Sequence, residues 1–337
     1  MAPLPKPKAT EERLAEIRQA AEENAAKART SSHPQIEGRG SYYGLPALKP
    51  PVWTWEVPLY FFLGGIAGVS CCMAFVAHLF RADPELIRWM LWMALAGAAV
   101  CPVLLIADLG RPSRFLNMLR VFKLQSPMSM GAWILVAFSG CAFLAVVGHE
   151  LVLRGYTLPM IFAIRWMGEA SGMITGLLLA SYTGVLIGAT AIPVWSANRK
   201  ILPAHFLTSG LGGSAGILEL AGFLIPATQI LGFVAAGIET IFEILFEVRK
   251  PAVNAPLHHG GSGITFRIAG LLEGPGALLI RIFWSSSPTG RHAAAICFLL
   301  GALLSRFAWI WAGRVSAKEP DQQFAMQRSA LAQRSSS

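Results

Sequence analysis

The sequence predicts an all-α, polytopic membrane protein, and two observations carry this prediction. Hydrophobic residues make up 54% of the 337 residues and charged residues only 14%, which does not suit a soluble globular domain. Long apolar runs also recur from residue 57 to residue 314, and a helix needs about 20 apolar residues to cross the hydrocarbon core of a bilayer. This stretch has room for eight transmembrane helices joined by short connections.

Both ends of the chain are polar. Residues 1–52 are expected to form a soluble N-terminal tail, in which Thr10 starts a helix that runs to about Arg29 and is followed by a linker rich in proline and glycine. This helix is either a loose surface helix or a docking arm for a partner. Residues 53–314 are expected to form the transmembrane domain, and residues 315–337 a polar C-terminal tail. The N-terminal tail lacks the short apolar core of a secretory signal, so the first span is expected to direct insertion and to remain in place.

Eight apolar segments mark the expected spans, in order 57–80, 87–109, 128–151, 168–192, 204–225, 228–248, 263–284 and 291–313. The seventh is interrupted by Arg267, Glu273, Gly274, Pro275 and Arg281. Irregular backbone is tolerated at membrane depth where it is buried in protein, so we expect an irregular seventh span that lies among the others. A surface-lying or re-entrant segment is the alternative.

Basic residues in the expected loops indicate the orientation. Eleven Lys and Arg residues fall on the side that holds the N-terminus and five on the opposite side, which favours cytoplasmic N- and C-termini. The net charge of +9 is spread over the tails and loops, and no basic run is interleaved with aromatic residues. Nucleic acid is therefore not an expected partner.

No metal or haem centre is expected in this chain. The five cysteines all fall inside apolar runs and form no C-x-x-C motif, so there is no sequence signal for an iron–sulfur cluster or a structural zinc site. A haem between helices needs two histidines at matching depth on facing spans. The candidate histidines instead lie at the ends of expected helices, namely His78, His149, His205 and His292.

Asp108 is the first candidate functional residue. It lies in the last turn of the second span, within the sequence LLIADLGRPSRFLNML, where a glycine and a proline end the helix. Arg111 and Arg114 follow and mark the membrane surface. An ionisable acid at the end of a membrane helix costs free energy, so by default it marks a functional site. The alternative is a helix-ending acid that pairs with Arg111 or Arg114.

Acidic residues on the sixth span form a second candidate group. Glu239, Glu243 and Glu247 follow one another at intervals of four and therefore share one stripe of a helix. They cannot all stay ionised in hydrocarbon unless a cation, water or protonation compensates, and Arg306 of the eighth span lies at the same depth. In one interpretation Arg306 pairs with Glu239 or Glu243. In the other, a proton path is formed by Glu239, Glu243, Arg306 and, deeper on the fifth span, Glu219.

Several short segments together resemble one family. They are Tyr42–Pro46, Trp53–Trp55, Tyr60–Gly68, Ala107–Phe115, Ser126–Trp133, Ser209–Ala215 and Ser305–Gly313. Each is a weak motif alone, but together they resemble the NrfD/PsrC-like membrane subunits across residues 42–315.

This resemblance implies two four-helix bundles and a quinone-reactive subunit of a respiratory oxidoreductase complex, which is not catalytic alone and carries no haem or iron–sulfur cluster. Menaquinone or ubiquinone would bind at the membrane face where a ferredoxin-like iron–sulfur subunit docks. That partner would exchange electrons with a molybdopterin, hydrogenase-like or multihaem catalytic subunit. The implied location is the bacterial cytoplasmic (inner) membrane.

The resemblance also implies which residues form the quinone site. Tyr60 falls where the family has a quinone-contacting histidine, and Glu56 lies beside the position of an asparagine. Asp108 replaces an acidic residue close to the quinone, and Tyr182 matches a site tyrosine. Tyrosine keeps a hydrogen-bond donor but does not titrate near neutral pH, so we expect Tyr60 to bind a quinone carbonyl and Asp108 to exchange the protons that quinone reduction needs. The other expected binding residues are Trp53, Trp55, Trp133 and Arg111.

Two alternative functions stand beside this one. The first is a membrane anchor or proton-conducting subunit without quinone chemistry of its own. The second is an independent transporter, for which the stripe of glutamates on the sixth span would be suited.

Overall fold

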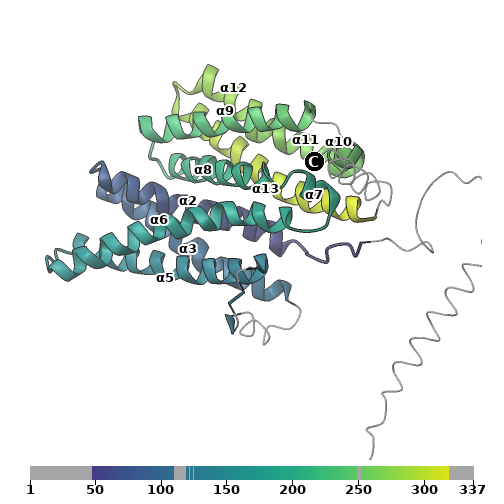
Figure 1. The fold of residues 1–337 in the computed structure, drawn as a ribbon. Helices are drawn as coiled ribbons and strands as arrows, with labels where there is room; N and C mark the ends of the chain where they lie inside the picture. The colour runs from purple at the N-terminus through teal and green to yellow at the C-terminus, as the bar shows by residue number, and fades with distance from the viewer. Residues whose placement is uncertain (1–47, 110–118, 121, 124, 249–251, 319–337) are drawn as a thin grey trace, which may run out of the picture. The chain divides into compact units, whose positions relative to one another are not determined.

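The computed structural model describes residues 48–109, 119–120, 122–123, 125–248 and 252–318. The helix expected from Thr10 to Arg29 lies outside the described residues, as do Arg111 and Arg114. Every regular element within the described ranges is a helix (Figure 1), which confirms the predicted all-α class.

Seven helical segments of the described chain are long and apolar enough to cross a membrane, which confirms a polytopic membrane protein. They are α2 (Glu56–Leu79), α3 (Pro84–Asp108), α5 (Pro127–Leu153), α6 (Pro159–Gly188), α9 (Pro226–Val248), the segment Gly260–Trp284 and α13 (Pro288–Lys318). The expected fifth span is also a helix, α8 (Leu202–Leu220), but its many glycine and serine residues make it less apolar than these seven. The count of eight spans therefore stays a prediction.

Proline marks the start of several of these helices. It is favoured in the first turn because its missing N–H has no helical partner there, and Pro84, Pro127 and Pro159 open α3, α5 and α6. The start at Pro159 corrects our expectation that the fourth span begins at residue 168. The charged residues Arg165 and Glu169 do not end this helix but lie inside it as an ion pair, with 3.5 Å between Nε and Oε1.

The long helices pack side by side (Figure 1). The helices α2 and α5 each pack against both α3 and α6, so these four helices surround a common interior. In the second half of the chain, α8 packs against α9 and α13, and α13 packs against α11 (Gly260–Leu271). Contacts of α8 with α2 and α6 join the two halves. Short helices also lie in the described connections, namely α7 (Pro193–Ala197), η3 (Ala252–Asn254) and α10 (Ala255–His258).

Glycines set the distance between α2 and its neighbours. Gly68 of α2 and Gly176 of α6 lie against each other, and a Cβ atom on either would overlap the backbone of the other. A Cβ atom on Gly210 of α8 would likewise lie 2.7 Å from the carbonyl oxygen of Gly65. Small residues let membrane helices approach closely, so α2 is held between α6 and α8.

The segment Gly260–Trp284 is irregular, as its sequence predicts. The helix α11 passes through a π-helical turn, η4 (Leu272–Gly276), into α12 (Ala277–Trp284). Pro275 lies in this turn and cannot donate the backbone hydrogen bond that a regular helix requires. The neighbouring Glu273 is only 1% exposed, so the turn places a carboxylate inside the protein.

Candidate functional site

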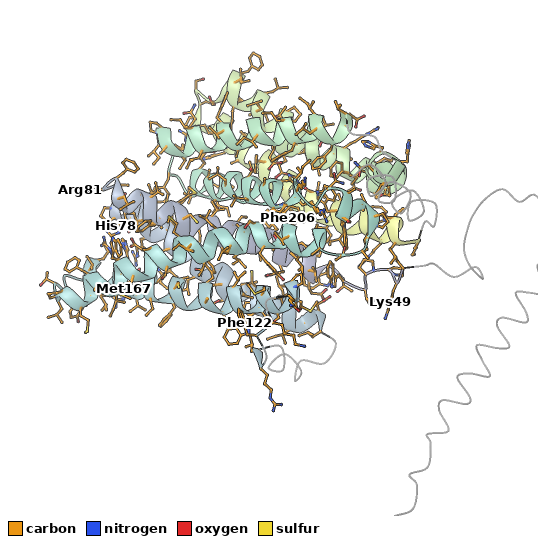
Figure 2. The ribbon with its side chains drawn as sticks, viewed as in Figure 1. Lys49, His78, Arg81, Phe122, Met167 and Phe206 are labelled. Carbon is orange, nitrogen blue, oxygen red and sulfur yellow. The ribbon has the colours of Figure 1, made fainter. Side chains whose placement is uncertain are left out.

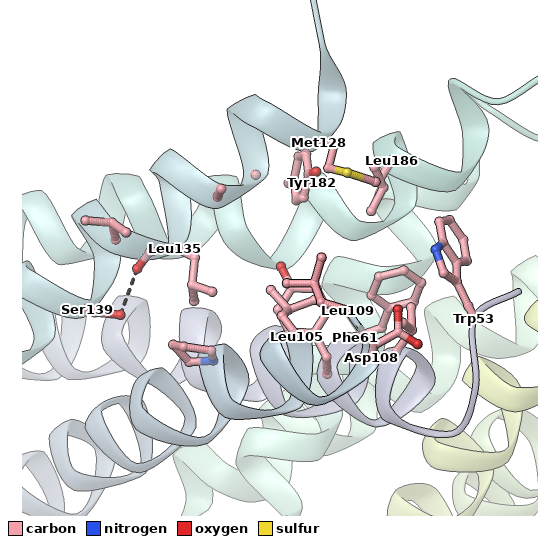
Figure 3. A pocket seen from close by; sticks show the side chains of 16 residues that line it. Trp53, Phe61, Leu105, Asp108, Leu109, Met128, Leu135, Ser139, Tyr182 and Leu186 are labelled. Carbon is pink, nitrogen blue, oxygen red and sulfur yellow. Dashed lines mark hydrogen bonds between the residues drawn. The ribbon is translucent and has the colours of Figure 1, made fainter. Parts of the chain in front are cut away.

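A cavity of about 290 Å³ lies between α2, α3, α5 and α6 (Figure 3). Its wall is mostly apolar and aromatic, with Trp53 and Phe61 among the lining residues. Its polar side chains are those of Tyr60, Asp108, Ser139 and Tyr182. Ser139 donates its hydroxyl hydrogen to the carbonyl of Leu135 (2.7 Å) within α5. The remaining three are the residues that sequence reasoning proposes for catalysis, and the structure brings them around one cavity.

Asp108 is the last residue of α3 and lies at the rim of the cavity, near Phe61 and Leu109 (Figure 3). Its Oδ1 accepts a hydrogen bond from the backbone N–H of Thr54 (3.3 Å), and the Thr54 hydroxyl, which donates to Glu56, lies 3.3 Å from the same oxygen. Thr54 belongs to the segment that leads into α2, so these contacts connect the start of α2 to the end of α3. The second oxygen, Oδ2, accepts no hydrogen bond from a described residue.

Tyr60 lines the cavity from α2 and is only 2% exposed. Its ring lies beside Gly64, where an added Cβ atom would lie 3.7 Å from the ring, an ordinary van der Waals distance. Among the described residues, the hydrogen bond that Tyr60 makes to another helix uses its backbone carbonyl, which accepts from the Cys101 thiol (3.9 Å), and not its hydroxyl. A phenol can donate one hydrogen bond and accept others, so the Tyr60 hydroxyl can offer a donor to a ligand oxygen.

Tyr182 is held differently. Its hydroxyl donates to the carbonyl oxygen of Pro127 at 2.6 Å, which ties α6 to the first turn of α5. The ring lies over Gly131, and a Cβ atom at that position would overlap it. The Tyr182 hydrogen is therefore used within the protein, and the hydroxyl can offer a ligand only an acceptor. Sequence reasoning gave no role to Gly131, although it lies in the Ser126–Trp133 motif.

Only one of the three candidate tryptophans lines the cavity. Trp53 does so, and its indole stacks on Trp195 with a centroid distance of 5.6 Å and an interplanar angle of 15°. Trp133 does not line it and packs edge-on against Phe122, with a centroid distance of 5.8 Å. Trp55 is 58% exposed and lines a separate surface hollow.

Two further predicted binding residues are not part of the cavity wall. The carboxylate of Glu56 lies outside the lining and accepts a hydrogen bond from the hydroxyl of Thr54. Arg111 lies outside the described residues, so the alternative in which it pairs with Asp108 is not addressed by the structure.

A buried cluster, which we define as His205, Glu239, Glu273 and Arg306, lies in the second half of the chain. His205 Nδ1 is 2.6 Å from Glu239 Oε2, and its Nε2 is 3.1 Å from the hydroxyl of Ser305. The expected ion pair between Arg306 and Glu239 or Glu243 is not among the ion pairs of the described residues. The guanidinium instead donates to the carbonyl of Phe206 (3.3 Å) and lies 3.8 Å above the ring of that residue.

Glu219 belongs to a different cluster. Its carboxylate, fully buried, is bound by Arg281 (Nη2 to Oε2, 2.8 Å) and Arg291 (Nη2 to Oε1, 3.0 Å). Along α8 it lies about 20 Å from His205, at 1.5 Å of rise per residue. The structure therefore does not place Glu219 beside Glu239 and Arg306, as the predicted path would require. Glu219 is thus the shared partner of two arginines in a buried ion triad.

His78, Arg165 and Glu169 form a further buried ionic group. His78 lies in the last turn of α2, at the end of the helices that is opposite to Lys49 (Figure 2). Its two ring nitrogens contact the carboxylate of Glu169 and the guanidinium of Arg165. The group thus compensates the charge of Glu169, which is fully buried inside α6.

The fold and the cavity define a polytopic helical membrane protein with a small-molecule-sized cavity between its first four long helices. The chain belongs to the NrfD family, because the family described as "Polysulphide reductase, NrfD" matches residues 45–229, more than half of its length. This matched range contains the whole cavity wall but, of the buried cluster, only His205.

Two curated proteins are similar to this chain. The C subunit of polysulfide reductase from Wolinella succinogenes is 30% identical over 183 residues, which cover 49% of this chain and 56% of that protein. Protein NrfD of Escherichia coli is 26% identical over 189 residues, which cover 50% of this chain and 59% of that protein. The chain thus matches little more than half the length of these relatives.

Proposed function

We propose that this chain is the quinone-reactive membrane subunit of a respiratory oxidoreductase complex and exchanges electrons between a partner's iron–sulfur subunit and the quinone pool. The observation that carries the proposal is the cavity. Its volume of about 290 Å³ is close to the lower end of the range for small-molecule sites, which are mostly apolar with a few convergent polar groups. The name of one relative, a polysulfide reductase subunit, supports a place in a reductase.

Quinone reduction takes up two electrons and two protons. In this proposal one side chain binds the quinone and another transfers the protons. Tyr60 lines the cavity, and its hydroxyl donates a hydrogen bond to one quinone carbonyl. Asp108 delivers or accepts protons at the rim, while Thr54 holds its other oxygen. Trp53 forms part of the wall beside the ring. The electrons come from, or go to, an iron–sulfur cluster in the partner.

The proposal includes the membrane arrangement. The helix α8 completes eight spans, which form two groups of four, and the end of the helices that holds Asp108 faces the docking iron–sulfur subunit. Both termini lie on the cytoplasmic side of a bacterial inner membrane, where the loops carry more basic residues. The catalytic partner is a molybdopterin, hydrogenase-like or multihaem subunit.

A binding experiment tests the quinone site directly. The purified full chain is titrated with a water-soluble short-chain quinone analogue, and the variants Tyr60→Phe and Trp133→Phe are compared. Loss of one hydrogen bond is worth about 0.5–1.5 kcal/mol, so Tyr60→Phe should raise the Kd by about 2- to 10-fold. Trp133→Phe, outside the cavity wall, is the matched control and should leave the Kd unchanged.

Two outcomes would contradict the proposal. Absence of saturable binding would favour a membrane anchor or proton-conducting subunit without quinone chemistry. Equal affinity of both variants and the unmodified chain would place the quinone elsewhere. Purification of the chain in a stable complex with a cluster-bearing subunit would argue against an independent transporter.

A further inference from the structure

The buried cluster contains hydrogen-bonding atoms that the protein does not satisfy. Oε1 of Glu239 and Oε1 of Glu273 have no partner in the described part of the chain, although these side chains are only 4% and 1% exposed. Nε and Nη1 of Arg306 are also without a partner there. Each buried polar group left unsatisfied costs about 1–3 kcal/mol. So many in one place indicate that the cluster binds something the polypeptide does not supply.

The space beside these atoms limits what can be bound. A hollow of about 10 Å³ is lined by His205, Glu239, Glu273 and Ser305, which is just room for one water molecule. One ring nitrogen of His205 and one carboxylate oxygen each of Glu239 and Glu273 lie within 4.8 Å of one another, so one water can lie between the two carboxylates. Water donates two hydrogen bonds, and the two unmatched carboxylate oxygens each need one.

The charge and the hydrogen bonds of the cluster favour a proton over a metal ion. If His205 is neutral, the charges of ionised Glu239 and Glu273 exceed the single charge of Arg306 by one, and an uncompensated buried charge is expensive. One proton shared by the two acids removes this excess. Both ring nitrogens of His205 already have partners, Glu239 and Ser305, so the histidine has no free atom for a metal ion.

A row of acidic groups connects the cluster to the surface. Glu243, one turn further along α9, lines the same hollow, and its carboxylate lies over Gly270, where a Cβ atom would overlap it. One more turn along, Glu247 is 45% exposed and pairs with His258 (3.3 Å) and Arg267 (3.9 Å). The three glutamates of α9 thus run from the half-exposed end of the helix to the buried hollow.

The inner end of this row lies close to the cavity. Arg306 lies over the ring of Phe206, which is packed among the helices (Figure 2). Phe206 in turn contacts Phe61, with a centroid distance of 6.0 Å, and Phe61 lines the cavity. Two aromatic rings therefore separate the charges of the cluster from the space inside the first four long helices.

We propose that His205, Glu239, Glu273 and Arg306 hold one exchangeable proton together with one water molecule, and that Glu243 is the group through which this proton exchanges with the Glu247 end of α9. The titratable and charged groups that face the proton are His205 from α8, Glu239 and Glu243 from α9, Glu273 from η4 and Arg306 from α13. The proposal concerns a proton-storage site and does not depend on quinone binding.

Infrared spectroscopy of the purified full chain, without any quinone, tests the proposal. A protonated carboxylic acid has a C=O stretch that is separate from the bands of ionised carboxylates and shifts when hydrogen is replaced by deuterium. We expect one such band to persist at about pH 8, far above the range in which exposed glutamates titrate. The variants Glu239→Gln and Glu273→Gln should each lose it or displace it, because each removes one of the two acids that share the proton.

Two further variants separate storage from exchange. Glu243→Gln should keep the band but slow its shift after transfer to heavy water, because the route to the surface is interrupted. Glu85→Gln, at a half-exposed carboxylate of α3, is the matched control and should change neither the band nor its exchange rate. The proposal is overturned if the unmodified chain lacks the band or if the band survives in both cluster variants. One equivalent of divalent metal, lost in Glu273→Gln, would also overturn it.

Discussion

Asp108 combines a fixed position with an unused acceptor. The backbone N–H of Thr54 donates to its Oδ1, so turning the carboxylate away from the rim breaks a hydrogen bond. Its Oδ2 has no partner among the described residues and lies beside the cavity. A general acid or base must be within hydrogen-bond reach of the atom it serves. The proposed quinone chemistry therefore assigns proton exchange to this carboxylate.

We therefore expect Asp108→Asn to leave the protein folded and to lower quinone turnover in the assembled complex by about 100-fold or more, since general acid–base catalysis typically contributes 10²–10⁴-fold. The amide can still accept the bond from Thr54, so the apparent melting temperature should hardly change. Steady-state turnover and a thermal unfolding curve measure the two effects. Normal turnover in this variant would remove Asp108 from the mechanism.

The second prediction at this scale concerns Gly131→Ala. The added Cβ would overlap the Tyr182 ring, so the ring must shift and the bond from its hydroxyl to the Pro127 carbonyl must break. We expect a loss of about 1–3 kcal/mol in the free energy of unfolding and weaker binding of a quinone analogue. Gly140→Ala is the control on the same helix, because nothing lies within 4 Å of its added Cβ.

Gly140→Ala should be neutral or slightly stabilising, since alanine is the better helix former by about 1 kcal/mol. If the two alanine variants behaved alike, Tyr182 would not depend on the missing side chain of Gly131.

At the scale of the elements, close backbone contact explains why α2 can lie between α6 and α8. Gly68 and Gly176 leave no room for a side chain between α2 and α6, and the obstacle is backbone rather than a flexible side chain. The cavity depends on this contact, because α2 contributes Tyr60 to its wall and α6 contributes Tyr182.

We expect Gly68→Ala to separate α2 from α6 and to lower the apparent melting temperature of the detergent-purified protein, with weaker binding of the analogue as a second effect. Because the added Cβ meets rigid backbone, we expect the free energy of unfolding to fall by about 1–3 kcal/mol. Gly237→Ala, on α9, has open space around the added Cβ and should leave both properties unchanged. An unaffected Gly68→Ala protein would show that the two helices separate without cost.

The elements were largely predictable because each span leaves a local signature. Apolar length located the long helices to within a few residues, and Pro275 with Glu273 indicated the irregular turn in Gly260–Trp284. The start of α6 was missed because Arg165 and Glu169 look like a loop in sequence, whereas the fold pairs them with each other inside the helix.

At the scale of the whole molecule, the partners of buried charges could not be predicted from sequence. Asp108, Tyr60 and Tyr182 were proposed together only through a family resemblance, and the structure places them around one cavity. His205 was treated as a helix-end residue, yet it binds Glu239, which lies on another helix. Such pairs depend on which helices become neighbours, and neither hydropathy nor spacing within one helix contains that information.

The hydrogen bond between Thr54 and Asp108 also makes a short mechanical linkage. The segment that enters α2 crosses the end of α3 at this point, and Trp53, the residue just before, forms part of the cavity wall. A displacement of this segment would therefore move an indole and a carboxylate together. The shape of the mouth and the direction of its acid are thus coupled through the same few atoms.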